Sequence, residues 1–152
     1  MNLLLDTGIL GQLCHPRQHK NRAVAQWLVQ LLRDAAGGVR VFIPEIADYE
    51  LRRKLLHLIL QGRGTTRSID RLDDLEKLLE YLPLDTEIMR RAAELWAEAR
   101  REGFPTAPAQ ALDGDVIIAA QALSVNGTIV TTNRKHLSKF VPAKEWPEIA
   151  VR

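Results

Sequence analysis

The chain has 152 residues and a formal net charge of +2 at pH 7; 46% of its residues are hydrophobic and 26% are charged. This composition is that of an ordinary globular protein and excludes a disordered chain, and the length suits a single domain covering residues 1–152. The small positive charge permits a polyanionic partner but does not require one. Cys14 is the only cysteine, which excludes an internal disulfide and a cysteine-based zinc site.

The sequence shows no sign of a membrane protein. No apolar run approaches the roughly 20 residues that a helix needs to cross a bilayer. The leucines near the N-terminus are not preceded by the positively charged region of a secretory signal peptide. We therefore expect a cytoplasmic protein with no membrane contact.

In the first half of the chain, short apolar runs alternate with longer segments whose apolar residues recur every three or four positions. The runs are too short for helices and suit buried strands, whereas the longer segments are typical of amphipathic helices. Residues 7–14 contain two glycines and end at His15-Pro16, which stops any helix that forms there. The predicted elements are a strand at 3–5, a helix at 21–36, a strand at 39–43 and a helix at 45–61.

Capping and turn residues divide the second half of the chain. Ser68 or Asp70 suits the start of a helix that runs to Tyr81. Residues 103–110, with two prolines, form the least structured segment. The other predicted elements are a short strand and turn at 82–85, a helix from Asp85 or Thr86 to Arg101, a helix at 113–125, a strand at 128–131 and an edge strand at 146–152.

Helices of a dozen residues or more separate most of these strands. Such connections allow parallel pairing, with right-handed crossovers that place helices on both faces of the sheet. The predicted fold class is therefore α/β: a three-layer α/β/α sandwich with a mostly parallel central sheet. No Gly-x-Gly-x-x-Gly follows the first strand, which argues against dinucleotide binding.

Acidic residues stand at the ends of the predicted strands or on the helices beside them. Asp6 ends the first strand, Glu50 lies on the helix after the second, and Asp113 and Asp115 directly precede an apolar helix. Sites in open parallel sheets form at the carboxyl ends of the strands, so we expect these acids to converge. Taken singly, Asp6 suits a turn, and Asp113 or Asp115 suits a helix cap. Glu50 suits a surface ion pair with Lys54.

Converging carboxylates predict a metal site. Three or four of them at one place repel one another unless a cation neutralises them. With oxygen ligands and no clustered histidine or cysteine, Mg²⁺ or Mn²⁺ is favoured over zinc. A water bound to such an ion becomes more acidic and is a ready nucleophile for a phosphodiester.

The spacing of Asp113 and Asp115 restricts how they can share one ion. Residues two apart on a helix are turned about 200° from each other, so both cannot face one metal if both are helical. One of them is therefore expected to belong to the preceding loop or cap. The spacing does not select which one.

The acids belong to an ordered set of motifs that covers nearly the whole chain. The set consists of the apolar strand ending in Asp6-Thr7, Pro44 followed by Glu50-Leu51, Asp115-x-x-Ile118-Ala119-Ala120, and Thr131-x-Asn133-x-Lys135-His136. In order and local context, the chain resembles the PIN-domain proteins, and within them the VapC-like toxins of bacterial toxin–antitoxin pairs. Each motif is weak alone, whereas the ordered set is specific.

The resemblance implies roles for these residues. Asp6 and Asp115 match the main metal ligands, and Glu50 matches a residue that binds metal through water or acts as a general base. The residues expected to support them, by holding ligands or waters or by capping the helix, are Thr7, Asp113, Thr131 and Asn133.

One departure from the family pattern concerns the last motif. Many relatives carry a further acid at or just after the position of Asn133, where this chain has a neutral amide and then His136. Fewer carboxylates favour a site for one metal ion or a lower metal affinity.

The resemblance implies a metal-dependent endoribonuclease that acts as a toxin. Its expected cofactor is Mg²⁺ or Mn²⁺, and its expected partners are RNA, a cognate antitoxin and a second copy of the chain in a homodimer. The leucine-rich helices around residues 55–60 and 72–82 are candidates for the dimer surface or the antitoxin groove. Two alternatives stay open: a related metal-dependent DNase or phosphatase, and a non-catalytic PIN-type module that binds RNA or protein.

Overall fold

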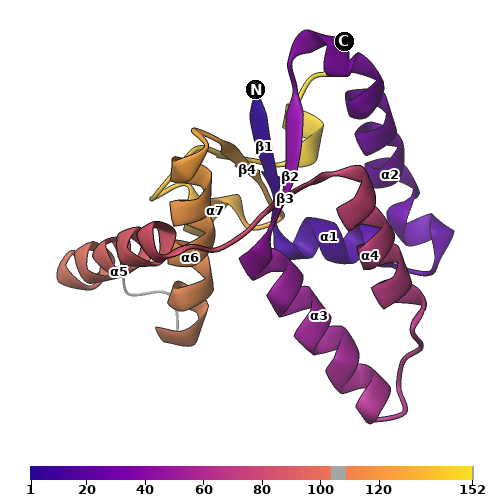
Figure 1. Cartoon of the computed structure of the whole chain (residues 1–152), viewed down its shortest axis with the longest axis horizontal. Helices are drawn as coiled ribbons and strands as arrows, with labels where there is room; N and C mark the ends of the chain where they lie inside the picture. Colours follow the sequence, from indigo (N-terminus) through magenta and orange to yellow (C-terminus); the bar gives the residue numbers. More distant parts are fainter. Residues whose placement is uncertain (104–108, 152) are drawn as a thin grey trace.

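The computed structural model describes residues 1–103 and 109–151 of the chain. Within these ranges, the strands form one parallel sheet in the order β3-β2-β1-β4-β5 (Figure 1). This arrangement confirms the predicted parallel sheet. The strands are β1 (Asn2–Leu5), β2 (Arg40–Pro44), β3 (Glu80–Leu82), β4 (Thr128–Val130) and β5 (Ala143–Lys144).

The first strand of the chain lies at the centre of the sheet. Leu3, Leu4 and Leu5 are fully buried. Because side chains alternate along a strand, Leu3 and Leu5 enter the core on one face while Leu4 enters the core on the other. Burial on both faces explains why this strand is a continuous apolar run.

Helices cover both faces of the sheet and complete the predicted three-layer sandwich (Figure 1). They are α1 (Thr7–Cys14), α2 (Gln18–Arg33), α3 (Glu45–Leu60), α4 (Arg67–Leu78), α5 (Thr86–Arg101), α6 (Ala109–Ser124) and α7 (Arg134–Leu137), with 3-10 turns at Asp34–Gly37 and Trp146–Glu148. The core on one face is built with α1, α2 and α4, and that on the other with α5, α6 and α7; α3 contributes to both. None of the described helices is both long and apolar enough to cross a membrane.

The edge strand predicted at 146–152 is wrong. Ala143–Lys144 pairs with β4 instead, and Trp146–Glu148 forms a 3-10 turn. Pro147 has no N–H to donate to a neighbouring strand. The side chains of Glu145 and Glu148 also cap this turn reciprocally, which stabilises it over an extended conformation.

The helix predicted at 113–125 begins earlier, at Ala109. Asp113 and Asp115 are therefore both inside α6, so the expectation that one of them lies in the preceding loop or cap is wrong. Leu112 is buried and continues the apolar side of the helix in the N-terminal direction. The helix start was predicted at Asp113 because Asp and Gly are frequent at the N-cap of helices.

Other boundaries moved by a few residues. α1 occupies the segment left undefined between the first strand and Pro16. The helix predicted to reach Tyr81 ends at Leu78, which frees Glu80–Leu82 to pair with β2. Of the segment 103–110, Gly103 follows α5 with a φ of +65° and Ala109 already belongs to α6; residues 104–108 lie outside the described residues.

Candidate active site

Asp6 lies at the carboxyl end of the central strand and is held at both carboxylate oxygens. It is the N-cap of α1, where Oδ1 accepts a hydrogen bond of 2.8 Å from the Thr7 backbone N–H. Oδ2 accepts a hydrogen bond of 2.7 Å from Oγ1 of Thr131, which follows the adjacent strand β4 and is fully buried. Asp6 thus has a capping role and a fixed orientation at the edge where the parallel strands end.

Thr131 also fixes the start of α7. Its Oγ1 accepts a hydrogen bond of 2.9 Å from the backbone N–H of Asn133. Asn133 itself is exposed and directly precedes α7. The hydroxyl therefore connects the Asp6 carboxylate to the loop that leads into α7.

Glu50 reaches the same place from α3. It is half-buried, and Thr7 donates a hydrogen bond of 3.4 Å from Oγ1 to its Oε1. Burial, and next the negative charge of Asp6, raise the pKa of Glu50, while Arg53 and the Thr7 hydroxyl oppose this shift. No ion pair between Glu50 and Lys54 is present among the described residues. Glu50 therefore lies beside the other carboxylates, and Arg53 is the cation whose charge acts on it.

The backbone of α6 passes close to Glu50 at a glycine. A Cβ atom at Gly114 would lie 3.1 Å from Oε1 and 3.3 Å from Oε2 of Glu50. A side chain there would press on the carboxylate. Gly114 thus permits the approach that brings the next residue, Asp115, to the site.

Asp115 is half-buried and is the third acid at this place. Burial has the largest effect on its pKa, followed by the charge of Asp6. Together with Glu50, they raise the pKa of Asp115 to about 6, although His136 and Lys139 act in the opposite direction. We call Asp6, Glu50 and Asp115 the site carboxylates, because each lies close enough to influence the charge of another.

Asp113 does not belong with them. It is exposed and lines a shallow, mostly apolar hollow between α5 and α6 with Met89 and Trp96. The difference follows from the helix geometry, which turns residues two apart to different sides. The structure therefore brings together Asp6, Thr7, Glu50, Asp115 and Thr131, with Asn133 beside them.

The donor set of the site carboxylates fits a hydrated magnesium or manganese ion. Among the described residues, no three acidic, histidine or cysteine side chains are gathered closely enough to bind one ion together. Mg²⁺ does not need such a cage, since it keeps several waters and is commonly bound through one or two carboxylates. Burial, and next the charge of Asp6, raise the pKa values of Glu50 and Asp115, and a bound cation would relieve the repulsion among these carboxylates.

Some residues near the site were not predicted. Gly114, Lys139 and Arg53 were not singled out from the sequence. Their influence on Glu50 and Asp115 depends on contacts between α3, α6 and the segment after α7. Such contacts leave no periodic signal in one sequence; only the lack of acids from Val116 to Lys144 hints at a positive surface there.

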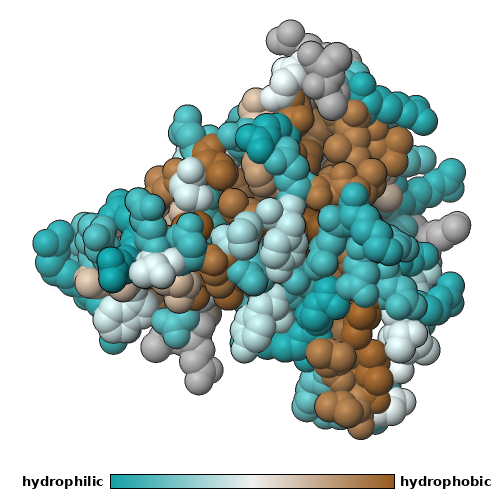
Figure 2. Space-filling model, viewed as in Figure 1, coloured by the Kyte–Doolittle hydropathy of each residue, from teal (hydrophilic) through white to brown (hydrophobic). Residues whose placement is uncertain are grey.

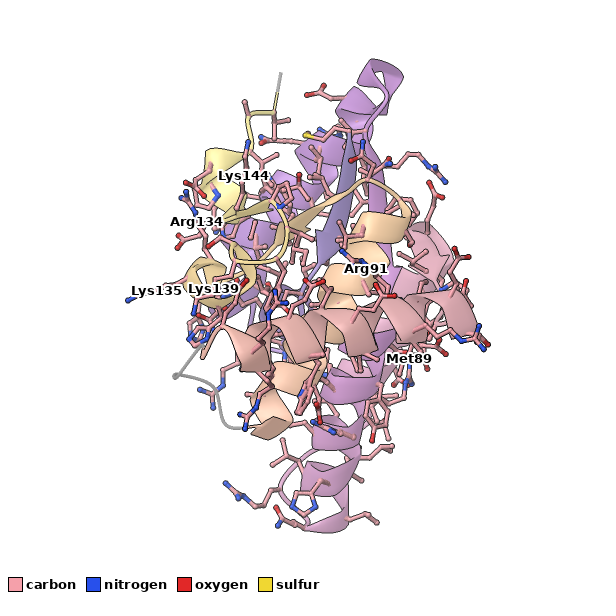
Figure 3. All side chains as sticks on the ribbon, turned by 90° about the vertical axis from the view of Figure 1, so that its left-hand side faces the viewer. Met89, Arg91, Arg134, Lys135, Lys139 and Lys144 are labelled. Atoms are coloured by element: carbon pink, nitrogen blue, oxygen red, sulfur yellow. The ribbon has the colours of Figure 1, made fainter. Side chains whose placement is uncertain are left out.

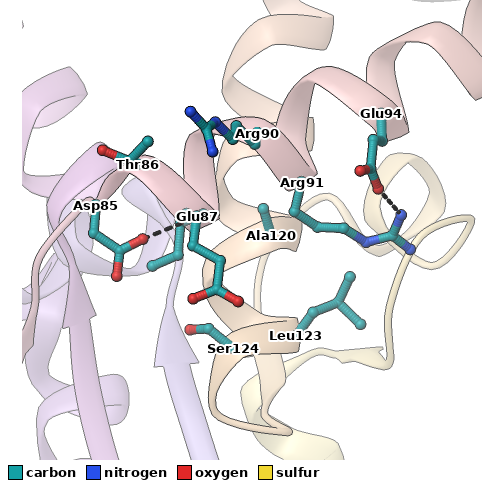
Figure 4. Close-up of a pocket in the computed structure, with 10 residues that line it drawn as sticks. Asp85, Thr86, Glu87, Arg90, Arg91, Glu94, Ala120, Leu123 and Ser124 are labelled. Carbon is teal, nitrogen blue, oxygen red and sulfur yellow. Dashed lines mark hydrogen bonds and ion pairs between the residues drawn. The ribbon is translucent and has the colours of Figure 1, made fainter.

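Two cavities differ in their position relative to the site carboxylates. One of about 730 Å³ lies between α5 and α6 (Figure 4), where Arg91 already pairs with Glu94 at 2.8 Å and Asp85 caps α5. None of its lining residues is a site carboxylate. A second, of about 760 Å³, is a groove formed by α1, α3 and the segment leading to α4, and Thr7 lies at its end. Of these two cavities, the groove is the one with a lining residue, Thr7, that binds a site carboxylate.

The family model described as "PIN domain" matches residues 3–140. The chain belongs to the PIN domain family. The match contains all three site carboxylates of this PIN domain. A search of curated proteins gave no significant match.

Solved structures with the same fold include three complexes. FitAcB from Neisseria gonorrhoeae has a TM-score of 0.70 and 24% identity, covering 97% of this chain and 99% of that chain. VapBC2 from Rickettsia felis, bound to a DNA fragment from the promoter, has a TM-score of 0.67 and 21% identity, with coverages of 96% and 99%. VapBC-1 from nontypeable Haemophilus influenzae has a TM-score of 0.67 and 22% identity, with coverages of 97% and 99%. At these identities, the likeness shows a shared fold.

Proposed function

We propose that this PIN domain is a metal-dependent endoribonuclease and the toxin of a VapC-like toxin–antitoxin pair, acting in the cytoplasm. The observation that carries the proposal is the convergence of Asp6, Glu50 and Asp115 at the carboxyl ends of the strands. Burial and mutual repulsion raise the pKa values of two of these acids, a pattern typical of functional sites. The ordered PIN motifs and the VapBC and FitAB complexes of the same fold support it.

Two of the site carboxylates are assigned to binding a cation, and the third to proton transfer. Asp6 and Asp115 supply carboxylate oxygens for Mg²⁺ or Mn²⁺, and Thr131 keeps Asp6 in its orientation. A bound cation would supply Lewis acidity: it would lower the pKa of water, the nucleophile that displaces a ribose oxygen from phosphorus. Glu50 either accepts a proton from that water or holds it by a hydrogen bond. Its raised pKa brings it nearer to the working pH, which suits a general base.

The groove of α1, α3 and α4 is the candidate binding place for an antitoxin segment. Leu55 and Leu58 line it, and it ends at Thr7 beside the site carboxylates. An apolar patch lies at the end of α3, where Leu56 and Leu60 are 47% and 87% exposed (Figure 2). A peptide with apolar side chains in this groove would cover the approach to the site. Leu72 of α4 is fully buried, so it is not available to a partner.

A homodimer stays a prediction. The exposed leucines of α3 are the part of the predicted 55–60 surface that a second copy of the chain can reach. Size-exclusion chromatography with light scattering of the wild type and of Leu56→Ser with Leu60→Ser tests it. A monomeric wild type would contradict the prediction.

The test of the activity is cleavage of a mixed RNA pool by the purified protein in EDTA, Mg²⁺ or Mn²⁺. We expect cleavage only with metal, and a loss of at least about a hundredfold in Asp6→Asn and Asp115→Asn, as expected when residues that act together are removed. Asp113→Asn is the matched control for Asp115→Asn, because it removes one negative charge from the same helix, α6, at a position outside the site. Equal activity in all variants would refute the catalytic assignment.

A second candidate function is a non-catalytic PIN-type module that binds RNA or protein. It is favoured by the neutral Asn133 and by the lack of a ready three-ligand cage among the described residues. RNA binding without metal-stimulated cleavage would support this candidate. Cleavage of single-stranded DNA in preference to RNA would instead support the related DNase.

A further inference from the structure

The positive charges near the site are concentrated in one part of the chain. From Val116 to Lys144 the sequence contains no Asp or Glu, although the whole chain has 19 acids. The charged residues in this stretch are all basic. They are Arg134, Lys135, Lys139 and Lys144, and His136 lies among them.

The structure gathers these cations on and around α7 and β5. Figure 3 shows Arg134, Lys135, Lys139 and Lys144 on the same side of the molecule, apart from Arg91 of α5. All four side chains are exposed. We call Lys135, Lys139 and Lys144 the α7 lysines. By contrast, α4 carries charges of both signs, with four acids and three bases.

The α7 lysines are held in a fixed relation to the site carboxylates. The hydroxyl of Thr131 binds Asp6 and the backbone just before α7, at 2.7 and 2.9 Å. The backbone N–H of Thr131 also donates a hydrogen bond of 3.0 Å to the carbonyl of Lys144. On the other side, Lys139 and His136 lie close enough to Asp115 to oppose the rise of its pKa. The positive surface therefore borders the site directly.

The charges of this surface are only partly neutralised. Arg134 pairs with Glu148 at 2.6 Å. Lys135 and Lys144 form no ion pair with any residue that the structure describes. Arg134 and Lys135 line a hollow of about 460 Å³ with Thr132, Asn133, Ser138 and Glu145. Several exposed lysines spread on and around α7 and β5 suit a chain of phosphates better than a single small anion.

We propose that the α7 lysines bind the phosphate backbone of the RNA strand on one side of the cleaved bond, so that the substrate runs over α7 and not along the groove of α1, α3 and α4. This inference rests on the proposed ribonuclease function. Lysine contacts to phosphate carry no direct sequence information. The surface therefore contributes affinity and register, and sequence preference arises elsewhere.

The test measures binding of a fluorescein-labelled, mixed-sequence single-stranded RNA by anisotropy, in EDTA so that no cleavage occurs, at several salt concentrations. The test variant replaces the three α7 lysines by Gln. The matched control replaces Lys54, Arg63 and Arg67 by Gln, which removes the same charge from exposed positions in or beside the groove. Circular dichroism melting verifies that both variants are folded.

We expect the α7 variant to bind roughly tenfold or more weakly at low salt. Its slope of log K against log salt should become shallower by about 2, since each phosphate contact on a single strand contributes about 0.7. The groove variant should bind within about twofold of the wild type. Equal losses in both variants, a larger loss in the groove variant, or no RNA binding by the wild type would each overturn the proposal.

Cleavage of the same RNA in Mg²⁺ is measured separately on the same preparations. Wild-type protein that binds RNA through the α7 lysines without cleaving it would leave this surface assigned and refute the nuclease function. Wild-type cleavage together with unchanged binding by the α7 variant would refute the surface and leave the nuclease function standing.

Discussion

At Gly114, helix stability favours a residue with a side chain, whereas the nearby Glu50 carboxylate leaves no room for one. Inside a helix, glycine is less favourable than alanine by about 1 kcal/mol. At this position, however, an added Cβ would lie 3.1 Å from Glu50 Oε1. The glycine is therefore explained by the space that the Glu50 carboxylate occupies.

We expect Gly114→Ala to raise the free energy of unfolding by up to about 1 kcal/mol and to reduce RNA cleavage by about tenfold or more, because Glu50 must move. Urea unfolding and initial cleavage rates measure the two effects. Gly11→Ala is the control: its Cβ would meet only Leu51 Cδ1, at 3.8 Å. That variant should gain stability at unchanged activity, and a similar loss of activity in it would contradict the explanation.

The negative charge of Asp115 lowers the stability of the folded state. Its pKa is raised from 3.8 to about 6, so the folded state binds its proton more tightly than the unfolded state does. The ionised form is therefore destabilising above about pH 6, and this cost disappears as the pH falls to about 4. Since Asp115 is partly exposed, solvent screening reduces the cost to about 1 kcal/mol.

We expect Asp115→Asn to raise the Tm at pH 7.5 in EDTA by about 2–4 °C. The difference from wild type should shrink between about pH 6 and pH 4, where the wild-type carboxyl becomes protonated in the fold. Calorimetry across this pH range checks both statements. Asp113→Asn should show no such pH-dependent gain, and a lower Tm for Asp115→Asn at pH 7.5 would contradict the assignment.

At the scale of elements, the contact between α3 and α4 depends on Arg52. Its Nε binds Asp48 at 3.0 Å within α3, and its Nη2 binds Asp73 at 2.8 Å and Glu76 at 3.1 Å on α4. The two α4 partners of Arg52 are 21 and 24 residues away along the chain. Ion pairs between helices have no fixed spacing and are not visible in one sequence.

We expect Arg52→Met to lower the free energy of unfolding by about 1–2 kcal/mol, since it leaves three neighbouring acids without their shared cation. Urea unfolding at low salt measures this loss. Arg91→Met, which removes an exposed ion pair with Glu94, should change stability by less than about 0.5 kcal/mol. Equal effects in the two variants would show that Arg52 is an ordinary surface residue.

The elements also show how far the sequence predicts this protein. The apolar runs and periodic segments were long enough to indicate β1, β2, β4 and the long helices, and hence the parallel sheet. The convergence of Asp6, Glu50 and Asp115 could be predicted because strand ends in a parallel sheet meet at one edge, and the resemblance to the PIN family selected Glu50 and Asp115 among the neighbouring acids. The short elements α7 and β5 were missed, since four and two residues are too few for a period. The start of α6 was misplaced because Asp113 resembles a cap.

At the scale of the whole molecule, metal binding and folding are linked. A ligand that binds only the folded state stabilises it, by about 1.4 kcal/mol at ten times its dissociation constant. We expect saturating Mg²⁺ or Mn²⁺ to raise the wild-type Tm by a few degrees, and to have little effect on Asp6→Asn or Asp115→Asn. Thermal unfolding with and without EDTA measures this. The same shift in both variants would place the ion elsewhere.

The order of the strands has a consequence for how the protein is made. β1 is synthesised first, yet its neighbour β4 ends at Val130, and the hydrogen bond from Thr131 to Asp6 joins residues 125 positions apart. On the ribosome, Asp6 therefore has neither Asp115 nor Thr131 beside it until residues 115 and 131 have been synthesised and have left the exit tunnel. For an enzyme of the proposed kind, translation must therefore pass Thr131 before a protein able to cut RNA exists.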